Sequence, residues 1–260
     1  MAIDMDPRIQ VQLMNHPNIR FRRATSRGRW AVRALLKKLP RLNQRATRQS
    51  VATWNDFNAY AKDFQNNGFA FIRDFLNEND YKTLKENWPK TRFFAPIGSK
   101  EKSKTSDKGL WCSEGKPLFE VEKNQALWNV YQMFISKEFR AEVTKLAGDA
   151  IERRPYHMLA QNSYWGSGLA PHRDSRDDEH KSKINFIYFV DANGEGWDSG
   201  GTSILRSNTF DEPIFIPDDL NNTCLFYYSE SEMFHGFPRL KFGKYRRNII
   251  AHFCAIEPER

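Results

Sequence analysis

The stretch Gly166-Ser-Gly-Leu-Ala-Pro-His-Arg-Asp174 contains the most informative pair of side chains in the sequence. His172 and Asp174 are two residues apart just after a glycine-containing turn, and on an extended segment positions i and i+2 project to the same side. One imidazole nitrogen and one carboxylate oxygen can then face a single metal ion. A lone His-X-Asp pair also occurs in ordinary loops, so further ligands have to come from elsewhere in the chain.

A third ligand is available in Phe234-His-Gly-Phe237, where His235 lies 61 residues beyond Asp174 and just past an apolar run. Two histidines and one carboxylate make the facial triad typical of non-haem Fe(II) oxygenases. That triad leaves coordination positions open for a chelating cosubstrate and O₂. Arg246 follows 11 residues after His235, at the start of an apolar strand. A guanidinium at that place can bind a carboxylate through two hydrogen bonds.

Strand parity indicates which of two adjacent arginines points into the site, because alternate residues of a strand face opposite ways. One face of the last strand, the more polar one, consists of Arg246, Asn248, Ile250 and His252. The other consists of Arg247, Ile249, Ala251 and Phe253. The polar face suits a site interior and the apolar face suits packing under helices, so we choose Arg246. A slip of one residue in register would reverse this choice.

The first part of the chain after residue 50 favours helices, and the part after residue 156 favours short strands. We expect helices at 54–65, 77–88, 124–136 and 137–148, with a strand at 69–75. Strands are expected at 157–164, 183–190, 202–205, 213–216, 223–228 and 246–253. The polar stretch 89–117 is long enough to serve as a lid. This order predicts an α+β domain whose C-terminal half is a β-sandwich or barrel.

Several segments occur in an order that resembles the Fe(II)/2-oxoglutarate-dependent oxygenases, particularly the prolyl-hydroxylase-like branch. They are Tyr164…His172-Arg-Asp174, Ile187-Tyr-Phe-Val190, Gly200-Gly-Thr202, Leu225-Phe-Tyr-Tyr228…His235 and Arg246-Arg-Asn-Ile-Ile250. The resemblance covers about residues 155–255, and residues 54–88 resemble the N-terminal support of that family. It implies an α+β fold with a double-stranded β-helix (jelly-roll) core and supporting N-terminal helices.

The resemblance also implies roles for single residues. The iron ligands would be His172, Asp174 and His235. Arg246 would bind the distal carboxylate of 2-oxoglutarate, with Tyr188 as its hydroxyl partner. The implied reaction uses Fe(II), 2-oxoglutarate and O₂ to hydroxylate or desaturate a substrate at an unactivated C–H bond, with release of succinate and CO₂.

Two more residues are expected near the cosubstrate. Tyr164 occupies a position that lies near the bound cosubstrate in relatives. Asn248 stands where relatives commonly have a small residue, and we expect it to contact the cosubstrate as well. Among other histidines, His180 lies in a charged run and His252 is expected to be a hydrogen-bonded core residue. Residues placed to line a pocket or its mouth are Trp111, Trp165, Trp197, Lys183 and Arg206.

The positive charge is concentrated in the first fifty residues. The chain has 260 residues and a formal net charge of +8. Residues 1–50 hold 12 basic and two acidic residues, a net charge of +10, whereas the other 210 hold 28 basic and 30 acidic residues, a net charge of −2. We therefore divide the chain into a basic N-terminal arm (1–50) and an oxygenase domain (51–260), with helical support in 51–150 and the jelly-roll in 151–260.

The arm has two interpretations, which both stay open. Residues 26–40 can form a short amphipathic helix that ends at Pro40, and residues 20–48 would then contact an anionic membrane surface. Alternatively, the arm is a solvated basic tail or a helix packed on the domain. A nucleic-acid partner is disfavoured because the rest of the chain is near neutral. The absence of a secretory signal and the odd number of cysteines favour a cytoplasmic protein, on the inner face of the membrane if the arm binds lipid.

The sequence leaves the substrate and the oligomeric state open. A membrane-bound arm would favour a glycolipid substrate, such as the Kdo sugar of lipid A, which bacterial hydroxylases of this fold modify. A free amino acid or another small molecule is the alternative, with the arm incidental. A third alternative is a metal-binding cupin without 2-oxoglutarate chemistry, which would not need the carboxylate clamp of Arg246 and Tyr188.

Overall fold

The computed structural model describes residues 51–90, 95–96, 108–113, 116–117, 124–148, 157–174, 183–194, 196–228 and 233–254. The basic arm of residues 1–50, and the amphipathic helix expected in it, lie outside the described residues. Among the described residues, no helix has both the length and the apolar character that a membrane crossing requires.

The α-helices and one of the 3-10 helices come from the first half of the described chain. They are η2 (Asn58–Tyr60, a 3-10 helix), α3 (Ala61–Asn67), α4 (Glu78–Glu86), α6 (Gln125–Ile135) and α7 (Lys137–Ala147). Side chains cap three of them: Asn77 begins α4, Asn124 begins α6 and Ser136 begins α7, each accepting a bond from a backbone N–H of the first turn. The helix expected at 54–65 begins only at residue 58, because Trp54 pairs with Leu76 in an isolated β-bridge.

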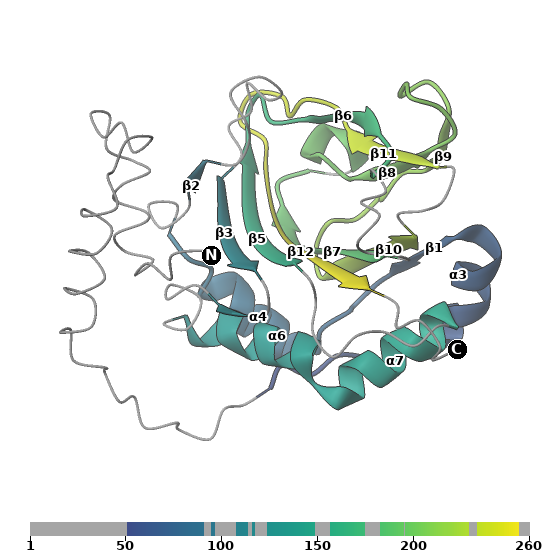
Figure 1. The fold of residues 1–260 in the computed structure, drawn as a ribbon. Helices are drawn as coiled ribbons and strands as arrows, with labels where there is room; N and C mark the ends of the chain where they lie inside the picture. The colour runs from purple at the N-terminus through teal and green to yellow at the C-terminus, as the bar shows by residue number, and fades with distance from the viewer. Residues whose placement is uncertain are drawn as a thin grey trace, which may run out of the picture.

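Two antiparallel sheets face each other (Figure 1). The larger has the strand order β1-β10-β7-β12-β5-β3-β2, with β4 paired to β3, and the smaller has the order β6-β11-β8-β9. The larger sheet consists of β1 (Phe69–Ile72), β2 (Ala95–Pro96), β3 (Lys108–Ser113), β4 (Lys116–Pro117), β5 (His157–Tyr164), β7 (Lys183–Ala192), β10 (Thr223–Tyr228) and β12 (Tyr245–Cys254). The smaller consists of β6 (Leu169–His172), β8 (Ser203–Leu205), β9 (Pro213–Phe215) and β11 (Phe234–Phe237), with the 3-10 helix η4 (Gly196–Ser199) before β8.

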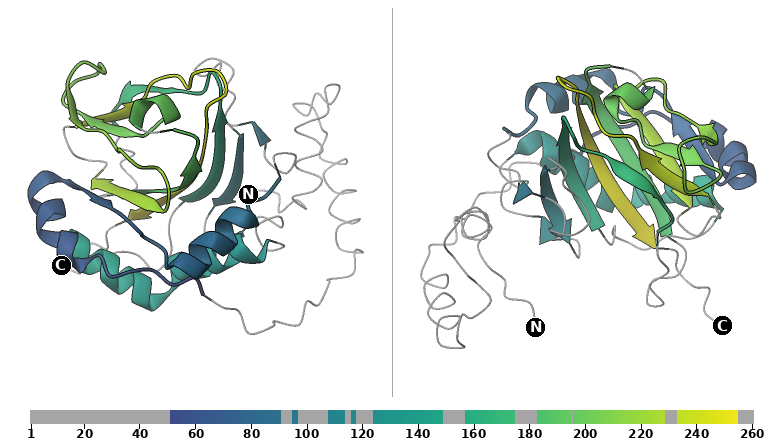
Figure 2. Two further views of the ribbon diagram at one scale, coloured as in Figure 1. Left: turned by 180° about the vertical axis from the view of Figure 1, so that it is seen from behind. Right: turned by 90° about the horizontal axis from the view of Figure 1, so that it is seen from above.

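From β5 onward the chain crosses from one sheet to the other at every connection except the one between β8 and β9. Strands β5, β12, β7 and β10 therefore lie side by side in the larger sheet, opposite β6, β11, β8 and β9 (Figure 2). This is the strand order of a double-stranded β-helix, and it confirms the predicted α+β fold class. We call the space between the two sheets the interior.

One strand of the larger sheet comes from a segment expected to be a lid. Residues 108–113 form β3, which pairs with β5 along its whole length, so this part of the polar stretch 89–117 extends the sheet. The expectation of a loop there is wrong, because Lys108-Gly-Leu-Trp-Cys-Ser113 has no alternation of polar and apolar residues that would reveal a strand. Most of the remaining stretch lies outside the described residues.

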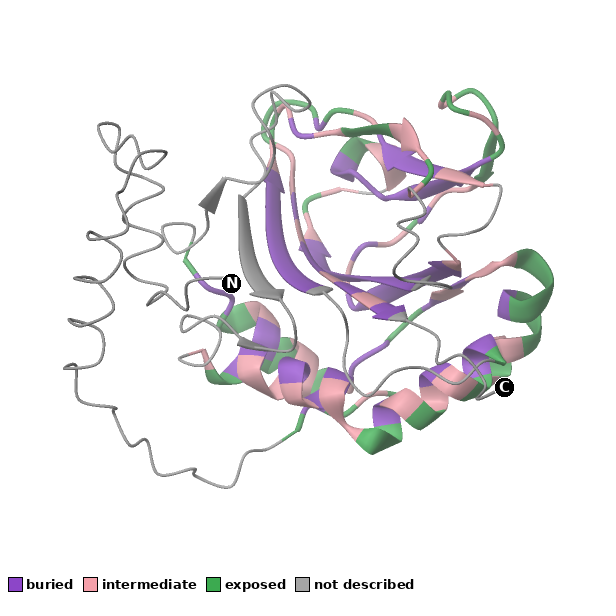
Figure 3. Ribbon diagram, in the orientation of Figure 1, coloured by how far each residue is buried: buried purple, intermediate pink, exposed green. Residues whose placement is uncertain are grey.

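The helices cover the outer face of the larger sheet (Figure 1). Figure 3 shows buried residues along both the helices and this sheet, and the two sets form one hydrophobic cluster. Phe139 of α7 is at the centre of this helix-covered core and is fully buried. Its ring contacts the rings of Trp54, Phe57, Phe75, Phe134, Phe186 and Phe253. Each such buried aromatic ring stabilises the fold by about 1.5–3 kcal/mol through burial alone. The core therefore anchors the larger sheet as a rigid base for the site.

Alternate residues of strand β7 face the helix-covered core and the interior. Ile184, Phe186, Tyr188 and Val190 belong to the helix-covered core. Ile187 and Phe189 belong to a second cluster, with Ile204, Leu220, Leu225 and Tyr227, which fills the interior. Both faces are apolar and buried, so β7 has an almost continuous apolar sequence.

The face predicted for Arg246 agrees with the structure. Ile249, Ala251 and Phe253 of β12 lie in the helix-covered core, so Arg246 and Asn248 point to the opposite face, the interior. The register between β12 and β7 shifts by one residue between Arg247 and Asn248. Arg247 is thereby paired with Asp191 on the outer face, where its guanidinium lies 3.5 Å from the carboxylate.

Candidate metal centre

Two neighbouring strands of the smaller sheet bring the predicted metal ligands together. His172, the last residue of β6, is directly opposite His235 of β11, and the centroids of their rings are 4.2 Å apart. Asp174 follows two residues later, and its Oδ1 is 3.6 Å from Nε2 of both histidines. One ligand atom from each of the three residues lies within 4.8 Å of the other two. This geometry suits one metal ion bound by two imidazoles and a carboxylate.

Gly236 lets β11 approach β6 closely enough for this arrangement. A Cβ atom at this position would lie 2.6 Å from the carbonyl oxygen of Leu169, which is too close for any side chain. The register shifts after His235, since His235 is opposite His172 whereas Phe237 is opposite Leu169. A side chain at position 236 would separate the strands and move the two histidines apart.

The environment of Asp174 favours its charged form. Burial alone would raise the pKa of this carboxyl, but the neighbouring imidazoles of His172, His235 and His252 and a hydrogen bond from Asn185 outweigh burial and lower the pKa to about 2. The Nδ2 amide group of Asn185 donates to Asp174 Oδ2 at 2.5 Å. The carboxylate is therefore ionised at neutral pH, the state in which it binds a metal.

The two histidines present their Nε2 atoms from different environments. Nδ1 of His172 is 2.9 Å from the carbonyl oxygen of Ala170, so Nδ1 carries the proton and Nε2 is left to face Asp174. Its closeness to Asp174 raises the pKa of His172. Burial lowers the pKa of His235 to about 4, although Asp174 acts in the other direction. His235 is therefore neutral at neutral pH, as a ligand must be.

Arg246 lies in the interior, and only 2% of it is exposed. Its Nη1 donates to the carbonyl oxygen of Gly200 and to the hydroxyl of Thr202, the latter at 3.0 Å, and its Nε donates to Ser163 Oγ at 3.4 Å. The centre of its guanidinium is 3.7 Å from the centroid of the Phe237 ring. These contacts from three segments of the chain hold the guanidinium plane in one orientation.

Asn248 is fully buried beside Arg246 on the same face of β12. Its amide Nδ2 donates to Gln161 Oε1 at 3.1 Å, and its own Oδ1 has no hydrogen-bond partner. A buried amide atom without a hydrogen-bond partner destabilises the fold unless a ligand supplies that partner. If both amides are turned over, Gln161 donates to Asn248, and the Asn248 NH₂ becomes a donor toward the interior.

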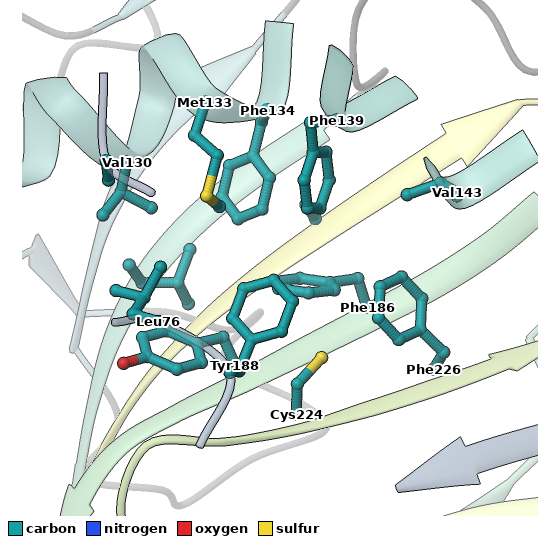
Figure 4. Close-up of a cluster of buried hydrophobic side chains, with 14 of the residues drawn as sticks. Leu76, Val130, Met133, Phe134, Phe139, Val143, Phe186, Tyr188, Cys224 and Phe226 are labelled. Carbon is teal, nitrogen blue, oxygen red and sulfur yellow. The ribbon is translucent and has the colours of Figure 1, made fainter. Parts of the chain in front are cut away.

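The expected role of Tyr188 has to be corrected. Its ring lies in the helix-covered core among residues such as Phe186 and Cys224 (Figure 4), and its hydroxyl donates to Asn222 Oδ1 at 2.9 Å. Arg246 points to the opposite face of the same sheet, so Tyr188 cannot share a carboxylate with it. The physical reason is parity: β7 places residue 188 outward and its two neighbours in the interior.

The expected role of Tyr164 is corrected for the same reason. Tyr164 is opposite Tyr245 in the pairing of β5 with β12, whereas Ser163 is opposite Arg246. Paired residues share a face, so Ser163 points into the interior and Tyr164 points away from it. The half-buried Tyr164 is therefore on the outer face of the larger sheet.

Four interior residues that the sequence did not single out surround the candidate site. Asn185 and Tyr227 lie next to the metal ligands: Asn185 bonds to Asp174, and the Tyr227 ring is 4.8 Å from that of His235. Ser163 and Thr202 contact Arg246. The sequence does contain a signal for Asn185. It is a polar residue in the apolar run 184–190, and a polar residue in such a run is expected to face the interior and to have a hydrogen-bond partner there.

None of the weaker candidates belongs to the three-residue cluster, and some of them lie outside the described residues. His252 bonds through Nδ1 to Asn185 Oδ1 at 2.5 Å, as expected for a hydrogen-bonded core histidine. Trp165 is 63% exposed, Trp197 donates its indole N–H to the hydroxyl of Ser203, and Arg206 is exposed after β8. Outside the described residues lie His180 and the side chains of Trp111 and Lys183.

No family model matches the chain, and no curated protein matches it by sequence. Solved structures do share its fold. A prolyl hydroxylase from Trichoplax adhaerens, in complex with a peptide fragment of hypoxia inducible factor, has a TM-score of 0.56 at 14% identity over 76% of this chain and 88% of that one. A prolyl-4-hydroxylase from Pseudomonas putida has a TM-score of 0.55 at 13% identity, over 76% and 98% of the two chains.

A third similar structure is HygX from Streptomyces hygroscopicus, solved with nickel and 2-oxoglutarate bound. Its TM-score is 0.53 at 9% identity, and the match covers 77% of this chain and 87% of that one. At such identities the likeness establishes the fold. The chain has the double-stranded β-helix fold found in Fe(II)/2-oxoglutarate oxygenases.

Proposed function

We propose that this chain is an Fe(II)- and 2-oxoglutarate-dependent oxygenase that hydroxylates a substrate at an unactivated C–H bond. The observation that carries the proposal is the convergence of His172, Asp174 and His235 beside an interior that also contains the buried Arg246. A metal triad alone fits many metalloproteins, whereas a buried guanidinium in the same interior fits a cosubstrate with a carboxylate.

The three ligand residues fit a ferrous ion. The donor set of two imidazoles and one carboxylate is the one that non-haem Fe(II) oxygenases use. His172 presents Nε2 because its Nδ1 is bonded to the Ala170 carbonyl, and Asp174 presents Oδ1 because its Oδ2 is bonded to Asn185. Each ligand is thus oriented by a neighbour, as metal ligands commonly are.

The residues around Arg246 fit the distal carboxylate of 2-oxoglutarate. Arg246 would hold that carboxylate, with the Thr202 hydroxyl 3.0 Å from its Nη1 as a neighbouring hydrogen-bonding group. With the amides of Asn248 and Gln161 turned over, the atom of Asn248 that lacks a partner is an NH₂ group, which could donate a hydrogen bond to that carboxylate. Tyr188 takes no part in this subsite, because it lies on the other face of the sheet.

When bound, iron and 2-oxoglutarate supply the oxidising chemistry that puts one oxygen atom of O₂ into a C–H bond, with succinate and CO₂ as the other products. The chain itself would orient the cosubstrate and shield it from bulk water. Arg246 would fix one end of the cosubstrate, and His172, Asp174 and His235 would hold the iron that binds its other end. Ile187, Phe189 and Leu225 form an apolar wall that keeps bulk water out of the interior.

The proposal is tested by adding Fe(II) and 2-oxoglutarate to the full chain without oxygen and recording the visible absorption. We expect the weak charge-transfer band of the chelate, followed by succinate formation when air is admitted. His172→Ala and Asp174→Ala should abolish both, because each removes a metal ligand. The exposed Asp218, which pairs with Arg73, provides the control variant Asp218→Ala, which should keep both signals.

Two results would contradict the proposal in different ways. Unchanged succinate formation in Asp174→Ala would show that the triad is not the metal site. Iron binding without the charge-transfer band would favour a metal-binding cupin, which has no use for the Arg246 subsite.

For the substrate we propose a small molecule or a glycolipid. The Kdo sugar of lipid A and contact with an anionic membrane both depend on residues 20–48, which lie outside the described residues, so they stay predictions. Mass spectrometry of metabolite and lipid extracts incubated with Fe(II), 2-oxoglutarate and the full chain identifies the substrate class by products heavier by one oxygen atom.

A further inference from the structure

The two carboxylate oxygens of Asp174 have different neighbours. Oδ1 is 3.6 Å from Nε2 of His172 and of His235, on the side where the three ligand atoms converge. Oδ2 accepts a hydrogen bond from the Nδ2 amide group of Asn185 at 2.5 Å. Asn185 is itself fully buried in β7. One oxygen therefore faces the metal site, and the other is held by the larger sheet.

Strand pairing fixes Asn185 from both sides. It is directly opposite Tyr227 of β10 and His252 of β12. Its Oδ1 is 2.5 Å from Nδ1 of His252. A carboxylate only accepts hydrogen bonds, so the NH₂ group of Asn185 must face Asp174, and its oxygen must accept from the Nδ1–H group of His252. Turning the amide over would put two acceptors together at Asp174 and two donors together at His252.

We propose that Asn185 is a positioning residue that restricts Asp174 to binding the metal through Oδ1 alone. This inference rests on the iron site proposed above. A carboxylate without such a partner can bind a metal through both oxygens. The second oxygen would then take a coordination position that the cosubstrate and O₂ need. Asn185, oriented in turn by His252, keeps that position open.

The test uses Co(II) as the probe metal, because its visible absorption changes with coordination number. Asn185→Leu replaces the amide by an apolar side chain of similar size. We expect about 10–100-fold weaker Co(II) binding, the usual effect of losing a residue that orients a ligand. We also expect altered Co(II) band positions and intensities, which a loss of stability alone would not produce.

Asn162 supplies a matched control in the same sheet. It is a buried asparagine of β5 that accepts a hydrogen bond from Trp88 Nε1 at 2.7 Å, on the face away from the metal site. Asn162→Leu should lower stability while leaving Co(II) affinity and the Co(II) spectrum as in the wild-type chain. Thermal unfolding of both variants measures the structural part of each substitution.

A second pair of variants applies if Asn185→Leu does not fold. His252→Phe removes the donor that orients Asn185, and His252→Gln keeps an N–H donor. We expect His252→Phe to weaken Co(II) binding and alter the spectrum in the same direction as Asn185→Leu, by a smaller factor. His252→Gln should restore both toward the wild-type values.

The outcomes separate this inference from the proposed function. A wild-type affinity and spectrum in a folded Asn185→Leu chain would overturn the positioning role while the iron site stands. Equal changes in Asn185→Leu and Asn162→Leu, or equal spectra in His252→Phe and the wild-type chain, would overturn it as well. A wild-type chain that binds no Co(II) would contradict the iron site and the inference together.

Discussion

Arg246 carries a permanent charge in a position where only 2% of it is exposed. A buried charge is costly unless hydrogen bonds and a counter-charge compensate for it. Gly200 and Thr202 supply hydrogen bonds, and the Phe237 ring lies against the guanidinium plane. The carboxylate of 2-oxoglutarate, if bound as proposed, would add a negative charge beside the guanidinium. The cosubstrate would thus complete an interaction that the protein has already oriented.

Arg246→Lys tests this at a single residue. The ammonium group keeps the charge but loses the two-pronged geometry, and a hydrogen bond between charged groups contributes about 1.5–3 kcal/mol. We expect the KM for 2-oxoglutarate to rise about 10–100-fold, measured as succinate formation against 2-oxoglutarate concentration. Arg247→Lys, on the outer face beside Asp191, is the control and should keep the wild-type KM. An unchanged KM in Arg246→Lys would remove Arg246 from the cosubstrate site.

At the scale of the element, β7 decides which tyrosine belongs to the site. Its outer residues fill the helix-covered core and its inner residues fill the interior, so a shift of one position changes a residue's environment completely. Tyr188 is fully buried on the outer side, where its hydroxyl and the backbone of Leu76 both bond to Asn222. Tyr188 therefore ties β7 to the segment that leads into α4.

Tyr188→Phe should then affect stability and leave the cosubstrate site unchanged. Removing the hydroxyl leaves Asn222 with one bond fewer, and we expect a loss of about 0.5–1.5 kcal/mol in the free energy of unfolding. The KM for 2-oxoglutarate should stay at the wild-type value. Urea unfolding followed by fluorescence measures the first quantity and succinate formation the second. A raised KM with unchanged stability would place Tyr188 back at the carboxylate.

The elements differ in how far their sequences reveal them. The parity of β12 is predictable because one face, with Arg246, Asn248 and His252, is clearly more polar than the other, with Ile249, Ala251 and Phe253. The parity of β7 is much harder to read, because apart from Asn185 every residue from Ile184 to Val190 is apolar, on both faces of the strand. The prediction for Tyr164 is wrong for a related reason. The face on which it lies depends on the register of β5 with β12, and the sequence of one strand does not reveal that register.

The ligand triad is predictable and the network that orients it is only partly so. His172, Asp174 and His235 can be found by spacing because metal ligands need particular atoms. Asn185 and Gly236 act through contacts with residues 11 positions away or on a neighbouring strand. Such contacts exist only after the strands are paired, so the sequence shows the residues but not their function.

At the scale of the whole molecule, charge and chemistry are separated along the chain. The proposed iron and cosubstrate residues all lie between positions 163 and 248, whereas residues 1–50 carry a net charge of +10. The remaining 210 residues carry a net charge of −2, so they have no general attraction to anionic surfaces. Any electrostatic binding to a membrane should therefore depend on the arm.

Vesicle sedimentation tests this dependence. The full chain should sediment with vesicles containing an anionic phospholipid and release as salt rises, because screening weakens exposed charges. A chain that begins at residue 51 should stay in the supernatant and still form succinate from 2-oxoglutarate. Neutral phosphatidylcholine vesicles are the control for the full chain. Equal sedimentation of both chains would remove the membrane function from the arm.

The direct pairing of His172 with His235 has a consequence for metal selection. Their separation is set by backbone hydrogen bonds between β6 and β11, and at Gly236 these two strands approach too closely for a side chain to fit between them. Little conformational entropy is lost when an ion binds to ligands already fixed in this way, so the metal can exchange without refolding of the protein. A cation that prefers a wider or flatter arrangement would have to distort a paired sheet. The rigidity of the backbone, as much as the identity of the ligands, would then discriminate among the divalent metals that compete for the site.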